Sequence, residues 1–306
     1  MLSALAGDLI GGWVGFVPTF AAPFLLAVLG LIITERGGTL NLGAEGVMAV
    51  GALLGVVAMA QGGHWSAALV LAVAGAVALS ALHAFLVVLL RLDQVLAGLV
   101  VFTAGIGFTG YAGLAFTNLP IAGLPELAMP ERWSLPAQDW LTWLAFLAAP
   151  VVWYVLARTE LGLRIRACGD DAAAADAMGL PVTGLRFGTT LVGGVFLGLA
   201  GAHLSLVGSH LWVDGMVAGR GWIAVVLVVF VRWNPLLAVA AAVMFGAIQA
   251  AIPFLQARGV AMPIHLVSMA PYLATIAVVL IFESGRRRNT SAPRDLAKPY
   301  LREDRN

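Results

Sequence analysis

The sequence predicts an all-α, polytopic membrane protein, a bundle of about 8–10 helical spans. Of its 306 residues, 61% are hydrophobic and 11% are charged, whereas average usage in proteins is about 25% charged. The mean hydropathy is +0.95, and nearly all charges lie between long apolar runs. These observations exclude a soluble domain, and the net charge of +1 gives no indication of nucleic-acid binding.

Nine apolar runs define the expected elements in chain order. They are Phe16–Ile33, Thr39–Ala60, Ser66–Leu90, Val95–Phe116, Trp140–Ala157, Phe187–Val207, Trp222–Val231, Leu236–Leu255 and Ile264–Phe282. The seventh is too short to cross a ~30 Å hydrocarbon core, because that takes about 20 residues. It therefore either recruits residues 214–220 or forms a half-helix, which predicts a broken helix near 213–222. Two small-xxx-small patterns, Gly51 to Gly55 and Gly194 to Gly198, favour close helix contacts.

The stretch Thr34–Gly46 breaks the apolar pattern with three charges, an asparagine and four glycines. Since Val47–Ala60 is too short to span alone, the second span must begin near Thr39, with a broken or half helix near 34–46. This brings Asn41 and Glu45 to membrane depth, and four-residue spacing puts them on one face if the segment is helical. A carboxylate there costs about 2.5–3.5 kcal/mol unless it faces protein or water. Asn41 and Glu45 therefore either line a translocation path or hold a kinked helix together.

The placement of the arginines predicts the orientation. Most of them fall at turns that lie on one side if the runs alternate, namely Arg36, Arg91, Arg158, Arg164, Arg166, Arg186, Arg232 and Arg286–Arg288. The positive-inside rule makes that side cytoplasmic, with the amino terminus outside and the carboxyl terminus inside. Residues 1–285 then form one transmembrane domain, and residues 286–306 are expected to be a disordered cytoplasmic tail. The single cysteine, Cys168, excludes an internal disulfide.

A short helix is expected at Asp170–Met178, within the cytoplasmic loop 158–186. Asp170 or Asp171 can cap its start, and Gly179 followed by Pro181 can end it. At about eight residues it would be marginal alone in water, so it gains order from packing against something. It either docks on a partner protein or lies on its own bundle. The candidate docking residues are Asp170, Asp171, Ala174, Asp176, Met178 and Gly179.

Polar residues gather near the end of the sixth run, at His203, Ser205, Ser209, His210 and Asp214. An intramembrane enzyme built on His203, Ser205 and His210 is one interpretation, although the chain has no Gly-x-Ser-x-Gly elbow and no metal-spaced histidine pair. A polar pore mouth or interface is the other. No metal site is expected. The chain also lacks a phosphate-binding loop, so it is not expected to hydrolyse ATP itself.

Three blocks of sequence resemble the ABC-importer permeases of the ribose, nucleoside and branched-chain amino acid superfamily. They are Thr34–Met48, the segment Arg158–Ala167 with Gly169 and Asp170, and Gly215–Ala224 followed by Arg232–Pro235. The Asn-Leu-Gly-x-Glu-Gly form of the first block is most similar to the smaller permease of nucleoside uptake systems, since ribose-type relatives carry Asp-Leu-Ser there. Val225–Leu227 is bulkier than the small residues common in the third block.

The resemblance implies an importer subunit in the bacterial inner (cell) membrane that moves nucleosides or a related sugar-like solute. It implies three partners: a cytoplasmic ATPase that binds ATP-Mg, a second, non-identical permease, and an extracytoplasmic solute-binding lipoprotein. No cofactor is expected in this chain. The residues expected to line or gate the path are Asn41, Glu45, Asp93, Gln94 and Trp222. The alternatives are the same machinery for a simple sugar or branched-chain amino acid, and a proton-coupled carrier with Glu45 as the proton site.

Overall fold

The computed structural model describes residues 2–127, 138–257 and 292–300, together with positions 269, 273 and 276. In chain order the elements are α1 (Leu2–Arg36), α2 (Ala44–Ala60), α3 (Trp65–Ala84), η1 (Phe85–Leu89), α4 (Gln94–Ala112), η2 (Gly113–Phe116), β1 (Glu126–Leu127), β2 (Gln138–Asp139), α5 (Trp140–Arg158), α6 (Glu160–Asp170), α7 (Ala172–Ala177), α8 (Val182–His203), η4 (Leu204–Ser209), α9 (Arg220–Phe230) and α10 (Pro235–Ala257). The two short strands pair antiparallel.

The predicted all-α membrane bundle is confirmed. Within the described residues, six helices are long and apolar enough to cross a membrane, and α2 and α9 are shorter apolar helices. Eight of the nine predicted runs are therefore helices, and the ninth, 264–282, lies outside the described residues apart from positions 269, 273 and 276.

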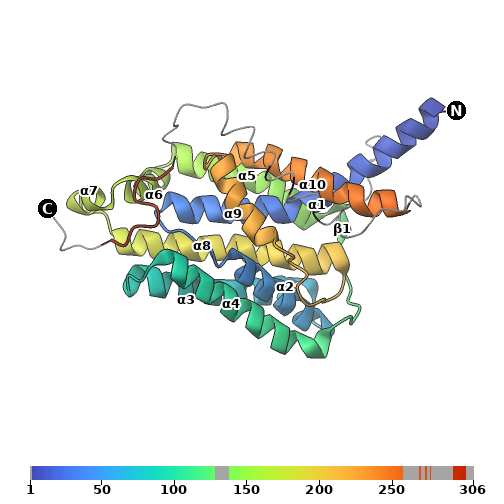
Figure 1. Ribbon diagram of the computed structural model, residues 1–306, viewed down its shortest axis with the longest axis horizontal. Helices are drawn as coiled ribbons and strands as arrows, with labels where there is room; N and C mark the ends of the chain where they lie inside the picture. The colour runs from blue at the N-terminus through green and yellow to red at the C-terminus, as the bar shows by residue number, and fades with distance from the viewer. Residues whose placement is uncertain are drawn as a thin grey trace.

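Helix α1 lies at the centre of the bundle. It packs against α10, α8 and α5, and Figure 1 shows it running between α8 on one side and α5 and α10 on the other. In its apolar window 78% of the residues are buried, against 28% for α4 and 33% for α3. The outer helices α3 and α4 therefore keep wide apolar faces exposed, as expected for helices in lipid, where burial of apolar surface between helices gains little.

The two predicted small-residue patterns meet each other. A Cβ atom placed on Gly51 in α2 would lie 2.7 Å from the carbonyl oxygen of Gly198 in α8. Only glycine allows the two backbones to come this close, which is how small residues hold membrane helices together.

Both predicted helix breaks are present, with shorter helices than expected. Residues 37–43 are turns and irregular chain, so α2 begins at Ala44 and not near Thr39. Asn41 consequently precedes the helix, and it does not share a helical face with Glu45. Residues 213–219 are also non-helical, and the 11-residue α9 is a half-helix that begins at Arg220.

Part of the segment expected to be a disordered tail is packed against the bundle. The backbone N–H of Asp295 donates to the carbonyl oxygen of Gly169 at 2.9 Å. Arg186 Nη1 donates to the carbonyl oxygen of Lys298, also at 2.9 Å. Leu296 packs against the main core, and Tyr300 packs beside Cys168. For residues 292–300 the structure therefore differs from that expectation, because turn-forming residues here find partners on α6 and α8.

The structure groups arginines from distant parts of the sequence at one end of the bundle. Arg36, Arg166 and Arg232 border a common pocket of about 370 Å³. We call this end, which also carries α6 and α7, the arginine-rich end; β1 and β2 lie at the opposite end (Figure 1). This grouping agrees with the predicted placement of these three arginines on one side of the membrane.

Candidate functional site

The irregular segment 37–43 is held by side chains from two other helices. Gln94, the first residue of α4, accepts a hydrogen bond from the backbone N–H of Leu40 at 2.6 Å. His83 Nε2, in α3, lies 3.0 Å from the carbonyl oxygen of Leu40. Because backbone groups inside a membrane need partners within the protein, these two contacts allow the chain to be non-helical at this depth.

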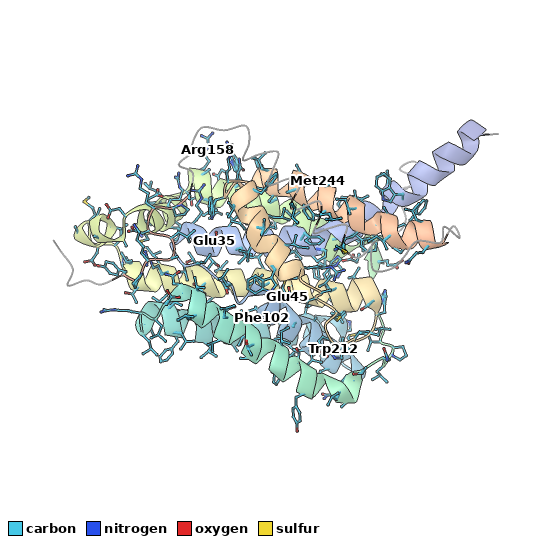
Figure 2. The ribbon with its side chains drawn as sticks, viewed as in Figure 1. Glu35, Glu45, Phe102, Arg158, Trp212 and Met244 are labelled. Carbon is cyan, nitrogen blue, oxygen red and sulfur yellow. The ribbon has the colours of Figure 1, made fainter. Side chains whose placement is uncertain are left out.

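Glu45 joins α2 to the beginning of α9. Its Oε1 accepts from the backbone N–H of Gly219 at 2.6 Å, and its Oε2 accepts from that of Gly221 at 2.7 Å. These N–H groups have no partner within α9, and the positive end of the helix dipole adds to the attraction. The carboxylate is nearly buried, at 6% exposure. Figure 2 shows Glu45 and Phe102 beside the end of α9.

The remaining residues expected to line a path lie around this junction. Asn41 is fully buried, and its Oδ1 accepts from the N–H of Gly43 at 2.9 Å, while its Nδ2 has no partner among the described residues. Asp93 is exposed and caps α4 by accepting from the N–H of Leu96 at 2.9 Å. Trp222 packs edge-on against Phe102, with ring centroids 5.5 Å apart. These contacts favour structural roles, and a role in solute passage stays a prediction.

Glu35 belongs to the same site but is absent from the predicted residues. It is 1% exposed, and its Oε2 accepts from Trp233 Nε1 at 2.6 Å. Trp233 lies in the turn after α9, so Glu35 holds the far end of the half-helix. The signal was available in the sequence, because Glu35 is a charge at the end of an apolar run and within the Thr34–Gly46 stretch.

The expected short helix in the loop 158–186 forms as α7. It has six residues, and Asp171 caps it by accepting from the N–H of Ala174 at 2.8 Å. Asp170 instead ends α6, while Gly179, with φ of +83°, provides the left-handed exit. Ala172 and Ala175 pack against Cys168 and Val182. The exposed face of α7 carries Ala173, Ala174 and Ala177, is flanked by Met178 at 83% exposure, and has Asp176 at its edge.

Helix α6 and the tail connect α7 to the end of α1. A Cβ on Gly169 would collide with the carbonyl oxygen of Arg36, so α6 ends in direct backbone contact with α1. Gly38, at φ of +93°, lies against the guanidinium group of Arg186 in α8. Asp295 Oδ2 accepts from the N–H of Ala172 at 2.8 Å, which ties the tail to the first residue of α7. A displacement of α7 would therefore be transmitted to the break at residues 37–43 through these three contacts.

Three of the polar residues near the end of α8, His203, Ser205 and Ser209, form hydrogen bonds with other groups. Ser205 Oγ donates to the carbonyl oxygen of Ala52 at 2.9 Å, whereas His203 Nε2 lies 2.8 Å from Thr142 Oγ1. His203 and Ser205 therefore do not form the hydrogen-bonded pair that the enzyme interpretation needs.

A cavity of about 600 Å³ lies at the end of the bundle opposite to α7. Its lining includes His203, Ser209, His210 and Arg220. Asn41, Glu45, Asp93, Gln94 and Trp222 do not line it.

Comparison with known proteins gives matches along almost the whole chain. The family model described as branched-chain amino acid transport system / permease component matches residues 14–282. The chain is 40% identical to the putative glucose ABC transporter permease protein TsgC13 of Haloferax volcanii, over 92% of this chain and 95% of that protein.

Two further relatives are named for nucleosides. The chain is 30% identical to the guanosine ABC transporter permease protein NupQ of Bacillus subtilis, over 92% of this chain and 94% of the relative. It is 31% identical to the nucleoside ABC transporter permease protein NupC of Lactococcus lactis subsp. cremoris, over 86% and 89% respectively. No solved structure matches the chain.

Proposed function

Because this chain belongs to the branched-chain amino acid transport system / permease component family, we propose that it carries nucleosides or a related sugar-like solute into the cell. It is a multi-pass ABC importer permease of the cell membrane. The observation that carries the solute assignment is the set of relatives at 30–40% identity, which are named for glucose, guanosine and nucleosides. The same machinery carrying a branched-chain amino acid is the alternative within the family.

ATP hydrolysis takes place on a partner ATPase that docks on α7. Three features support this docking surface: the small exposed side chains of Ala173, Ala174 and Ala177, the adaptable side chain of Met178 next to them, and the position of α7 at the arginine-rich end. A second permease and an extracytoplasmic solute-binding lipoprotein complete the complex. Family membership supports these partners.

Movement of α7 reaches the half-helix α9 through the end of α1. The route runs from α7 and α6 to Arg36, through the Gly169 contact, and from there to the two glutamates that flank the 37–43 break. Glu35 and Glu45 hold the two ends of α9, so a shift of the break moves this half-helix. Both ends of α9 and the break would have to move together, which suits a gate with two discrete positions.

A proton-coupled carrier with Glu45 as the proton site has no support from the relatives, which are named as ABC permeases. The geometry also opposes this alternative, because both carboxylate oxygens of Glu45 accept backbone hydrogen bonds. Proton uptake would weaken one of these bonds, because it places an O–H donor opposite a backbone N–H donor.

The test is transport by the complete complex in proteoliposomes, with the ATPase, the second permease and the solute-binding lipoprotein present. We expect uptake of radiolabelled guanosine or glucose that needs ATP, is unchanged when a proton gradient is dissipated, and exceeds the uptake of leucine. Uptake of leucine alone would support the branched-chain amino acid alternative. Uptake that follows the proton gradient without ATP would contradict the proposed function.

A further inference from the structure

The pocket of about 370 Å³ at the arginine-rich end has a basic wall. Arg36, Arg166 and Arg232 line it, and they come from the end of α1, from α6 and from the turn between α9 and α10. A fourth arginine, Arg158, lies over the ring of Trp153 in the same wall, with its Cζ 5.9 Å from the ring centroid. No aspartate or glutamate is among the described residues that line this pocket. A concave site with several arginines and no carboxylate is suited to an anion.

The arginines of the pocket are only partly balanced by acidic groups. Arg166 and Arg232 form no ion pair with any described carboxylate. Arg36 is attracted by Asp170, the last residue of α6, but it is also repelled by Arg166. Because like charges that are held close together destabilise each other, an anion bound between Arg36 and Arg166 would relieve this repulsion.

The turn that carries Arg232 has an unusual backbone. Arg232 and Trp233 follow each other with φ of +55° and +54°, in the left-handed region that only glycine enters freely. Such strain persists only where the surrounding structure holds it, and it often marks a functional site. Trp233 is held on two sides, since its Nε1 donates to Glu35 and its carbonyl oxygen accepts from Arg36 Nη2 at 3.4 Å. Arg232 itself is exposed where it borders the pocket.

The remainder of the wall is largely apolar and belongs to two membrane-spanning helices. It includes Trp153, Leu156 and Ala157 in the last turns of α5, and Pro235 and Leu237 at the start of α10. Within two turns of this wall the same helices expose large apolar side chains, at Leu147, Val151, Leu236 and Leu237. Helices that face lipid expose such side chains, and tryptophan is typical of the membrane interface. The pocket therefore lies at the depth of the lipid headgroups, where spanning helices end.

The two halves of the wall together favour one class of ligand. A phospholipid uses both halves, because guanidinium groups bind its phosphate and the apolar side chains of α5 and α10 contact its acyl chains. A soluble anion would use only the basic half. The proposed docking surface for the ATPase is also separate, since Figure 1 shows α7 further out along the long axis than the adjoining ends of α5 and α10.

We propose that this pocket binds the headgroup of an anionic phospholipid from the adjoining leaflet, with Arg36, Arg166 and Arg232 around its phosphate. Basic pockets between membrane helices are suited to such headgroups. Since the three arginines belong to separate elements, one bound lipid links the end of α1, α6 and the turn after α9. These are the parts through which movement of α7 is proposed to reach the half-helix. The binding itself does not depend on the solute that the permease carries.

The test measures binding of phosphatidylglycerol to the complete complex in detergent by native mass spectrometry, for Arg232→Gln and for the matched control Arg91→Gln. Arg232 and Arg91 are both exposed, and their φ angles are +55° and +57°. Both belong to the side predicted to be cytoplasmic, but Arg91 does not line the pocket. The two substitutions therefore remove the same surface charge from the same backbone conformation. We expect the Kd of the first bound lipid to rise about tenfold or more in Arg232→Gln and to stay within about twofold in Arg91→Gln.

An equal rise of the Kd in both variants would overturn the proposal, because the arginines would then act only as diffuse surface charge. Equal affinity of the wild type for phosphatidylcholine, whose headgroup has no net charge, would also overturn it. Displacement of the lipid by inorganic phosphate at the same concentration would indicate a site for a soluble anion. Weaker assembly with the ATPase and unchanged lipid binding in Arg232→Gln would indicate a protein contact. Either of these two results contradicts the lipid assignment.

Thermal unfolding of the complex with and without phosphatidylglycerol provides a second measurement, because a ligand of the folded state raises the Tm. Arg232→Lys keeps the positive charge and loses the forked geometry of the guanidinium group. We expect the lipid to raise the Tm most in the wild type, less in Arg232→Lys and least in Arg232→Gln. The same rise in all three proteins would show that Arg232 does not contact the lipid.

Discussion

Glu35 and Glu45 hold the two ends of the half-helix α9, which follows them by about 180 residues in the chain. Glu45 accepts hydrogen bonds from Gly219 and Gly221, which are 174 and 176 residues away. Glu35 accepts a hydrogen bond from Trp233, which is 198 residues away. The two glutamates flank the same break in the chain between α1 and α2. The break and α9 therefore form one mechanical unit, and the first predictions concern this unit.

Glu45→Gln removes the charge and keeps one acceptor oxygen. We expect this variant to retain most of its ATP-driven uptake and its ATP dependence, with a modest loss of thermal stability. Glu45→Ala leaves both N–H groups without the side-chain acceptor, which costs about 1–3 kcal/mol each, and should lower the Tm and abolish uptake. Wild-type uptake and Tm in Glu45→Ala would rule out both the structural and the transport role.

The hydrogen bond between Glu35 and Trp233 predicts an energetic coupling of about 1 kcal/mol between Glu35→Ala, which removes the acceptor, and Trp233→Phe, which removes the donor. It is measured by thermal unfolding of the two single variants and the double variant in detergent. Trp143→Phe is the matched control, because Trp143 Nε1 has no hydrogen-bond partner among the described residues. Strictly additive effects of Glu35→Ala and Trp233→Phe would contradict the link.

Ala174→Trp places a bulky side chain on the exposed face of α7. We expect ATP hydrolysis to be uncoupled from uptake, so that uptake falls about tenfold or more while membrane insertion is unchanged, because a wide side chain prevents a close fit to the ATPase. Ala67→Trp is the control, since Ala67 is also exposed but lies at the start of α3, at the opposite end of the bundle. Normal coupling in Ala174→Trp would show that α7 is only part of a loop.

Asp295→Ala removes the acceptor for the N–H of Ala172 and should loosen the tail from α7. Cys168 reports on this change, because it is fully buried beside Tyr300 and burial raises the pKa of its thiol. In the wild type we expect slow alkylation that stays slow up to a pH above the usual thiol range, since only the thiolate reacts.

In Asp295→Ala the alkylation of Cys168 should be about fivefold faster, as for a local opening made easier by about 1 kcal/mol. Arg294→Ala is the matched control, because it removes an exposed charge of the same segment and keeps the carboxylate of Asp295. Equal alkylation rates in the wild type and Asp295→Ala would show that the tail does not hold this region.

The predicted orientation is tested with reporter fusions after Arg186 and after Arg288. Both should report a cytoplasmic location, because the arginines on this side outnumber those on the other. A periplasmic signal at either position would contradict the proposed topology.

The sequence by itself determined the membrane class, eight helical segments and the two breaks, because these follow from local features: run length against membrane thickness, and glycines and charges within apolar runs. The caps of α7 were equally local, and Asp171, Gly179 and Pro181 mark its ends as expected. Only the tertiary structure decided which groups these residues contact. Glu45 at the start of α2 and Gly219 before α9 become partners through the packing of α2 against α9, and no local pattern specifies that pairing.

The tail also shows this difference between what local sequence features predict and what the tertiary structure decides. Residues 292–300 contain two prolines and lack a helical pattern, so nothing local predicts order. The backbone groups of Gly169 and Ala172 and the guanidinium of Arg186 nevertheless offer them hydrogen bonds. The hydrogen bonds that join Asp139, Thr142 and His203 likewise exist only because β2, α5 and α8 are brought together. Hydrogen bonds between distant segments depend on the relative placement of whole helices, which is a property of the packed bundle and not of any one stretch of sequence.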